Sequence, residues 1–167
     1  MRSMFRVMIL SLAGLALGAP MAVSGEQGDD HIAPKSAQLE QSGKALLGLG
    51  KLSEAEDVLE TALALDPRNR WAFVDLARVA ERQHLFGKAI RMTNKALLIE
   101  PNDPDAIAVQ GEAMVEIGAV PRAQANLQKL HTICGAKGCP QIGQLSAAIS
   151  RGPTVASVKP PESPKTN

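Results

Sequence analysis

The sequence repeats with a period of 34 residues. Three consecutive segments, 36–69, 70–103 and 104–137, align with one another without gaps. Apolar residues recur at the fourth position of the segments, small residues at the eighth and alanine at the twentieth: Leu39, Phe73 and Ile107; Gly43, Ala77 and Gly111; Ala55, Ala89 and Ala123. A short unit that recurs at a fixed period cannot bury its apolar face alone, so the three segments are expected to stack on one another.

Each segment is predicted to form a helical hairpin. Apolar residues recur at steps of three and four over two runs of about 13 residues, which is typical of amphipathic helices. In the first segment Gly50 lies in the predicted turn, and Ser53 followed by Glu56 predicts a capping box at the start of the second helix. At the start of the third segment, Asp103 fits an N-cap and Pro104 the first helical position.

This pattern resembles the tetratricopeptide repeat family over the whole predicted folded domain, residues 36–150. The resemblance implies an all-α fold, a right-handed superhelical stack of three helix hairpins. An apolar face that continues after Pro140 predicts a further helix, 140–150, which would cap the third hairpin. The second segment departs from the family pattern, because it has His84 where glycine is usual and Thr93 where a large apolar residue is usual.

The two ends of the chain have a different composition. Arg2 and Arg6 precede an apolar run over 7–19 and then small residues, which is the order of a secretory signal peptide. Cleavage is expected after Ser24, although an uncleaved anchor is the alternative; the apolar run is shorter than the ~20 residues that span a bilayer. We therefore expect a periplasmic or otherwise exported protein without stable membrane insertion after cleavage. Residues 25–35 are predicted to be a flexible leader and 151–167 a disordered, proline-rich tail.

The composition argues against several classes of function. Loss of Arg2 and Arg6 would leave a net charge of about −1, and only 2% of the residues are aromatic. Nucleic-acid binding, which uses a basic stripe and stacking aromatics, is therefore not expected. The sequence contains no nucleophile elbow, no phosphate-binding glycine loop and no His-Glu-x-x-His motif. We expect no enzymatic activity, no cofactor and no metal.

The resemblance implies that the first helix of each hairpin lines a concave groove that binds a peptide or protein segment. The residues at the matching positions are Glu40, Gln41, Lys44, Trp71, Val74, Asp75, Arg78, Arg82, Asp105, Val109, Glu112 and Glu116. Some family members hold a C-terminal carboxylate with Lys, Asn and Arg at such positions. Here most of these sites have the wrong charge, so such a clamp is not expected. An apolar spot around Trp71 and Val74 is predicted, with Trp71 either an anchor for the peptide or a packing residue between hairpins.

The only two cysteines, Cys134 and Cys139, follow the third segment. They could be a disulfide that fastens the capping helix, a redox centre, or part of a metal site with His131. Four residues separate them where redox motifs have two, and zinc would need a fourth ligand. The disulfide is therefore favoured. The chain is predicted to be a non-enzymatic interaction scaffold outside the cytoplasm; the alternatives are a redox or metal-dependent module, or a self-associating subunit whose groove is filled by another copy or by its own tail.

Overall fold

The computed structural model describes residues 31–154, and these form seven α-helices and one short 3₁₀ helix. The predicted signal peptide and the predicted tail from residue 155 onward lie outside the described residues, as does most of the predicted leader. The elements are α1 (Pro34–Gly48), α2 (Leu52–Leu65), α3 (Arg70–Arg82), α4 (Phe86–Ile99), α5 (Pro104–Glu116), α6 (Val120–Cys134), η1 (Gly135–Lys137) and α7 (Pro140–Arg151).

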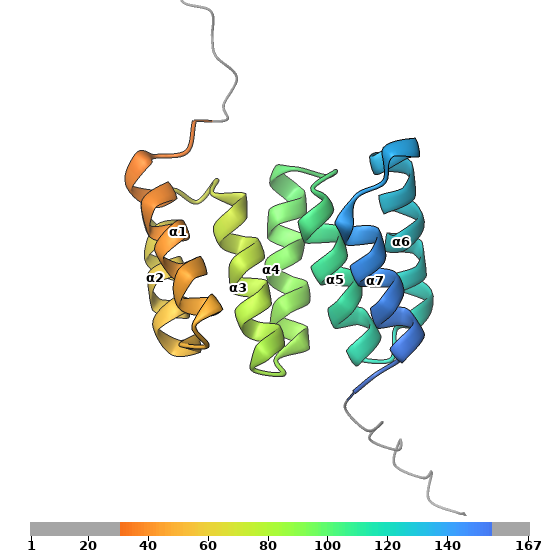
Figure 1. Ribbon diagram of the computed structural model, residues 1–167. Coiled ribbons are helices and arrows are strands. Elements are labelled where there is room, and N and C mark those ends of the chain that lie inside the picture. Colours follow the sequence, from red (N-terminus) through yellow and green to blue (C-terminus); the bar gives the residue numbers. More distant parts are fainter. Residues whose placement is uncertain (1–30, 155–167) are drawn as a thin grey trace, which may run out of the picture. The chain divides into compact units, whose positions relative to one another are not determined.

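The helices pair in chain order (Figure 1). Helices α1 and α2, α3 and α4, and α5 and α6 pack as hairpins, and each hairpin packs on the next. Helix α7 lies against α5 and α6 at the end of the stack. The described residues contain no strand, so the predicted all-α fold is confirmed.

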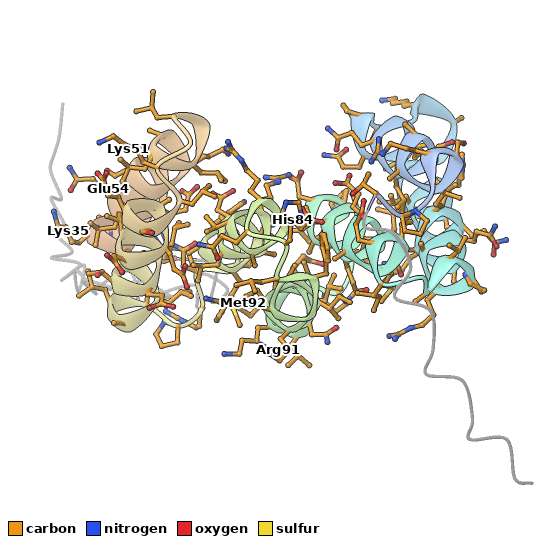
Figure 2. All side chains as sticks on the ribbon, turned by 90° about the horizontal axis from the view of Figure 1, so that it is seen from below. Lys35, Lys51, Glu54, His84, Arg91 and Met92 are labelled. Carbon is orange, nitrogen blue, oxygen red and sulfur yellow. A yellow bond between two sulfur atoms is a disulfide. The ribbon has the colours of Figure 1, made fainter. Side chains whose placement is uncertain are left out.

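The stack has an inner and an outer row of helices. In the inner row α1 contacts α3, α3 contacts α5, and α7 continues the row by packing on α5. In the outer row the backbones of α2, α4 and α6 lie farther apart, although the long side chain of Lys88 in α4 reaches Glu56 in α2. Because the inner helices are closer together than the outer ones, the stack curves with the inner row on its concave side. Figure 2 shows this arch, with Arg91 and Met92 of α4 on the convex side.

Small residues at the eighth position of the repeat allow the helices to approach closely. A methyl group added to Gly43 in α1 would lie 2.5 Å from Cγ of Leu59 in α2. One added to Gly111 in α5 would lie 2.6 Å from Cδ1 of Leu145 in α7. Both leucines are fully buried in the clusters that fill the space between the rows. Helix α7 therefore covers the third hairpin through a contact that a larger residue than glycine would obstruct.

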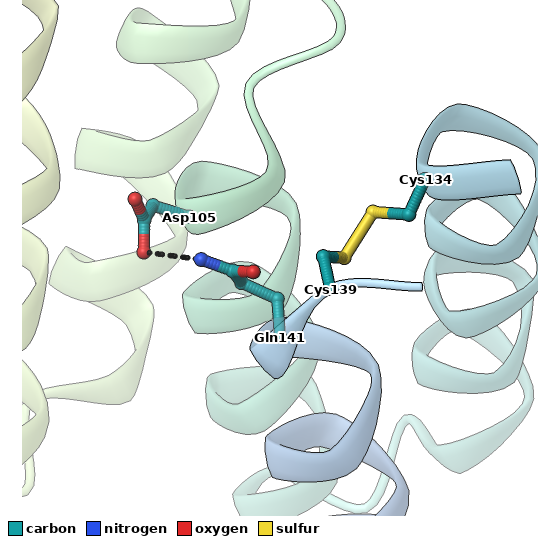
Figure 3. The surroundings of a disulfide bond; sticks show 4 residues. All are labelled: Asp105, Cys134, Cys139 and Gln141. Carbon is teal, nitrogen blue, oxygen red and sulfur yellow. Dashed lines mark hydrogen bonds between the residues drawn. A yellow bond between two sulfur atoms is a disulfide. The ribbon is translucent and has the colours of Figure 1, made fainter. Parts of the chain in front are cut away.

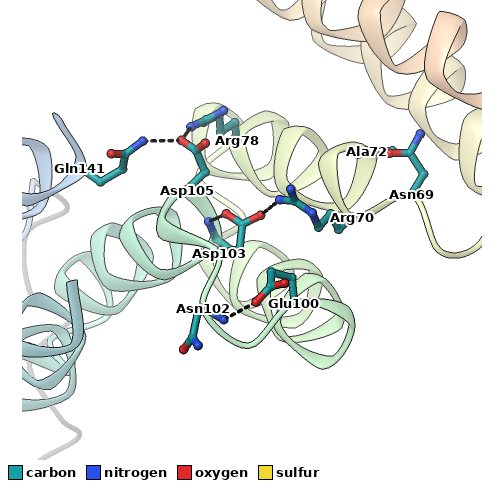
Figure 4. A network of polar contacts seen from close by, with 10 residues as sticks. Asn69, Arg70, Ala72, Arg78, Glu100, Asn102, Asp103, Asp105 and Gln141 are labelled. Atoms are coloured by element: carbon teal, nitrogen blue, oxygen red, sulfur yellow. Dashed lines mark hydrogen bonds and ion pairs between the residues drawn. The ribbon is translucent and has the colours of Figure 1, made fainter. Parts of the chain in front are cut away.

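Polar residues repeat at the junctions between hairpins. The side chain of Asn69 accepts a hydrogen bond from the Ala72 amide (3.2 Å) and donates one to Ser36 Oγ (2.9 Å). At the next junction Asp103 accepts from the Ala106 amide (3.0 Å) and forms an ion pair with Arg70 (Figure 4). Asp103 is thus the N-cap of α5, as predicted.

The predicted capping box of the first hairpin is wrong. Helix α2 begins at Leu52, so Ser53 is already helical, and no side chain caps this end. Leu52 packs against the core and extends the helix, and the carbonyl of Lys51 accepts the first helical hydrogen bond. Glu56 instead bonds to Gln83 (3.0 Å) and pairs with Lys88 of the neighbouring hairpin.

The folded domain is also longer at both ends than the predicted one. Helix α1 begins at Pro34 instead of residue 36, and the amide of Ala33 donates to Oδ2 of Asp66 at 2.9 Å. Arg151, the first residue of the predicted tail, is the last residue of α7. Tertiary hydrogen bonds thus hold residues that composition alone indicates to be loose.

Candidate functional site

The concave side of the stack contains a groove formed by two adjoining hollows. The central hollow, of about 520 Å³, is lined by Leu47, Arg78, Glu81, Arg82, Val109, Glu112 and Gln144. The C-terminal hollow, of about 280 Å³, is lined by Glu81, Arg82, His84, Phe86, Glu112, Glu116, Arg151 and Thr154. Since the two hollows share three residues, they form one continuous groove. It crosses α1, α3, α5 and α7, which is the complete inner row.

A row of charged and polar side chains crosses the inner helices beside the groove. Arg78 of α3 donates to Asp105 of α5 at 2.8 Å, and Gln141 of α7 donates to the same carboxylate oxygen at 3.2 Å (Figures 3 and 4). Burial opposes ionisation of Asp105, but the Gln141 amide and the Arg78 guanidinium outweigh it and hold the pKa of Asp105 below its usual value. The row ties α7 to the two preceding hairpins.

Two acidic residues, Glu40 of α1 and Asp75 of α3, meet at the other end of this row. Asp75 is buried, and this raises the pKa of its carboxyl group. Burial and the neighbouring Asp75 raise the pKa of Glu40 to about 7, against the effect of Lys44. Oδ2 of Asp75 has no hydrogen-bond partner among the described residues. A proton shared between the two carboxyl groups would give that oxygen a partner and would limit the repulsion between the first and second hairpins.

The groove itself has an acidic floor. Glu81 of α3 lies near Glu112 and Glu116 of α5, and burial together with these charges raises the pKa of Glu81 to about 8, although Arg78 opposes the shift. Burial also raises the pKa of Glu112, against Arg78 and Arg151. These carboxyl groups are partly buried, so a cation that entered the groove would favour their ionised forms and interact favourably with them.

The predicted groove residues divide into four groups in the structure. Those that line the hollows are Arg78, Arg82, Val109, Glu112 and Glu116. Those that form or adjoin the charged row are Glu40, Lys44, Asp75 and Asp105. Gln41 and Trp71 are exposed and line neither hollow, and Val74 belongs to the core. Arg78 is shared by the first two groups, which makes it the link between the groove and the charged row.

The residues of the predicted apolar spot, Trp71 and Val74, line neither of the two hollows. Val74 is 2% exposed and packs in the cluster between the second and third hairpins, because its side chain points into the stack. Trp71 is 44% exposed, and the guanidinium of Arg70 lies 4.1 Å from the centre of its ring. Trp71 is therefore not a buried packing residue, and its role as an anchor for the peptide stays a prediction.

Cys134 and Cys139 are joined by a disulfide, with their Cα atoms 5.7 Å apart (Figure 3). The bond connects the end of α6 to the residue that precedes α7. Together with the Gln141–Asp105 hydrogen bond, it fastens α7 at the end of the inner row. The described residues contain no group of three or more His, Cys, Asp and Glu side chains placed to hold a metal ion.

Comparison with known proteins agrees with this geometry. A tetratricopeptide repeat family model matches residues 46–113. This segment is similar to tetratricopeptide repeats. It covers most of the first repeat, the whole second repeat and most of α5 in the third. A search of the curated proteins finds no match to the sequence.

Solved structures with this fold include several tetratricopeptide repeat domains. The Sgt2 domain from Aspergillus fumigatus is similar at a TM-score of 0.65 and 21% identity, over 71% of this chain and 79% of that one. The TPR2B domain of yeast Sti1, in a complex with pHsp70, gives 0.64 and 19%, over 71% and 98%. The Yersinia enterocolitica type III secretion chaperone SycD, in a complex with a peptide of the translocator YopD, gives 0.60 and 19%, over 69% and 86%. At these identities the likeness shows the fold.

The repeat frame also indicates which groove residues were not predicted. Leu47 and Glu81 both occupy the twelfth position of their repeats, one turn of helix after the ninth-position residues Lys44 and Arg78. That periodicity could have found them. Gln144 and Arg151 belong to α7, which was predicted only from its apolar face. The polar face of a helix does not by itself indicate what it will meet.

None of the described helices combines the length and the apolar character that crossing a membrane requires.

Proposed function

We propose that this chain is a non-enzymatic scaffold that binds a peptide or protein segment in its concave groove. The supporting observation is the groove itself, which crosses α1, α3, α5 and α7 and displays acidic and basic side chains on a partly apolar surface. An extended or helical segment with charges of both signs suits such a surface. Structures with this fold include domains solved in complexes with pHsp70 and with a translocator peptide.

The groove suits an internal segment better than a free C-terminal carboxylate. The three residues that both hollows share are Glu81, Arg82 and Glu112, so acids outnumber bases where the hollows meet. The guanidinium of Arg82 already donates to the carbonyl of Leu47. Like charges brought together in a partly buried site disfavour binding. A cationic side chain on the partner is the expected contact at this point.

We also propose that the protein works outside the cytoplasm, as part of a larger envelope assembly. Two features support this: the signal-peptide pattern that ends near Ser24, and the disulfide between Cys134 and Cys139. Disulfides form and persist mainly in oxidising compartments. A fusion of residues 1–30 to alkaline phosphatase, an enzyme that needs export to become active, tests the location. An inactive fusion that is nevertheless produced would refute export.

Peptide binding can be tested without knowledge of the natural partner. A display library of random peptides is selected on the purified protein, and the affinity of the selected peptides is measured by fluorescence anisotropy. Glu112→Gln is expected to weaken the binding of a cationic peptide by about 1 kcal/mol, which raises its Kd roughly fivefold. Glu60→Gln, which changes an exposed residue on the outer helix α2, is the matched control and should leave the Kd unchanged. Selected peptides that bind both variants equally would place binding elsewhere.

A further inference from the structure

The described chain does not leave the molecule where α7 ends; it turns into the groove. Gly152 ends α7 with φ of 73°, a left-handed conformation that suits glycine, and its amide donates to the carbonyl of Ala148. Two residues later, the amide and the hydroxyl of Thr154 both donate to Oε2 of Glu116 at 2.8 Å. Thr154 is thus part of the wall of the C-terminal hollow.

The charges around this hollow leave its acidic side open to a further cation. Glu81, Glu112 and Glu116 face it, together with Arg82, Arg151 and His84. Arg78, which also acts on Glu81 and Glu112, is already bonded to Asp75 and Asp105, and Arg82 donates to a backbone carbonyl of α1. Burial raises the pKa values of Glu81 and Glu112, and the charges of Glu112 and Glu116 add to the shift of Glu81, so the cations present do not fully compensate the ionised forms.

Thirteen residues, VASVKPPESPKTN, follow Thr154 and contain two lysines and one glutamate. The first cation is Lys159, five residues beyond Thr154. A chain of that length reaches at most about 17 Å. The distance from α7 across α5 to α3 is two interhelical spacings, about 16–20 Å. With its own long side chain, Lys159 can therefore reach Glu81 and Glu112, and the three prolines reduce the entropy lost on docking.

We propose that residues 155–167 dock in the concave groove of their own chain, with Lys159 against Glu81 and Glu112, and compete there with the peptide partner. The inference uses the surface of the proposed function and adds to it a regulatory segment. A short tether gives an effective concentration in the millimolar range, so an intrinsic Kd of about 1 mM would fill the groove in about half of the molecules. An external peptide then binds with an apparent Kd equal to its intrinsic Kd divided by the fraction of molecules whose groove is open.

The test compares the protein that carries residues 155–167 with a variant that ends at Thr154, which keeps every described helix. Two-dimensional amide NMR spectra of the two are expected to differ mainly at Glu81, Glu112 and Glu116. A synthetic peptide of residues 155–167, added to the shortened protein, should move the same signals with a Kd of about 1 mM or below. Spectra that coincide within α3 and α5 would overturn the proposal.

Substitutions in the complete protein give a second readout that does not depend on truncation. Lys159→Glu is expected to reproduce the spectrum of the shortened protein at the groove, whereas Lys165→Glu should have a smaller effect. Equal effects of the two would overturn the assignment of Lys159. Differences that grow with protein concentration would place the tail in a second copy and refute docking within one chain. Library selection on the shortened protein tests the proposed peptide binding separately, so either idea can fail alone.

Discussion

The close approach of α1 to α2 predicts a sharp response to one methyl group. In a Gly43→Ala variant the new Cβ would lie 2.5 Å from Cγ and 2.8 Å from Cδ2 of Leu59. The nearest of these atoms is the branch point of the side chain, so rotation of a terminal methyl group cannot remove the clash. Leu59 is fully buried, with core residues around it. Either the leucine or the whole helix must therefore move.

The expected magnitude follows from two opposing effects. Overpacking of a dense core typically costs about 1–3 kcal/mol, and the short distance to Cγ places this site in the upper half of that range. Against this loss, replacing a helical glycine by alanine stabilises the helix by about 1 kcal/mol. The net loss in the free energy of unfolding should be about 1–2 kcal/mol, or roughly 3–10 °C in Tm for a domain of this size.

Gly48, in the last turn of the same helix, provides the matched control. A Cβ added there meets no atom within 4 Å, so Gly48→Ala should be neutral or stabilising by up to about 1 kcal/mol. Urea unfolding followed by circular dichroism measures both variants. If Gly43→Ala were as stable as Gly48→Ala, the close approach of the two helices would be refuted.

The second repeat suggests a compensating change. At the positions that Gly43 and Leu59 occupy in the first repeat, the second has Ala77 and Thr93, both fully buried. Leu59→Thr alone should cost about 2–4 kcal/mol, mainly through lost apolar contacts. The double variant Gly43→Ala, Leu59→Thr should lose about 1 kcal/mol less stability than the sum of the two single variants, because the smaller side chain leaves room for the methyl group. If the stability losses of the two single variants simply added in the double variant, direct contact between residues 43 and 59 would be refuted.

Three further perturbations have defined outcomes. Replacement of Cys134 and Cys139 by serine should lower stability by roughly 2 kcal/mol and increase hydrogen exchange within α7, while peptide binding persists; unchanged exchange in α7 would refute the fastening role. Because burial and Glu112 raise the pKa of Glu81 from its ordinary value to about 8, its stabilising contribution is complete at low pH and is lost as the pH rises from about 4 to 8. Glu81→Gln should therefore flatten the decline of Tm between pH 5 and 8 relative to the outer-helix control Glu60→Gln, and an equal decline in both would contradict the assignment. His84 adopts φ of 58° where the other repeats have Gly50 and Gly118. His84→Gly should therefore raise the free energy of unfolding by about 0.5–1 kcal/mol. A lower free energy of unfolding would show that the edge-on contact of His84 with Phe86 outweighs the backbone strain.

Much of the fold could be predicted because its information is local. Leu39, Phe73 and Ile107 recur at a fixed spacing, and each hairpin buries them against its immediate neighbours. The N-cap at Asp103 could also be read directly, since a cap depends on a few adjacent residues. Ser53 shows the limit of such motifs. Leu52 gains contacts in the core, and the helix therefore begins two residues before the capping motif predicts.

The groove depended on contacts that no single segment contains. Val74 and Glu81 belong to one helix but have different surroundings. The third hairpin packs on Val74 and buries it, whereas Glu81 lines a hollow that α7 completes. Glu116 accepts a hydrogen bond from Thr154 after Gly152, in a left-handed conformation, has ended α7.

The sequence by itself determined the number, order and pairing of the α-helices. Each hairpin buries its apolar residues against adjacent hairpins, so the spacing of apolar and small residues within each repeat is enough to indicate the pairing. The tertiary structure decided which charges face one another across the concave side. Their burial and pKa values depend on helices that are distant in the sequence, and so does the path of the chain into the groove.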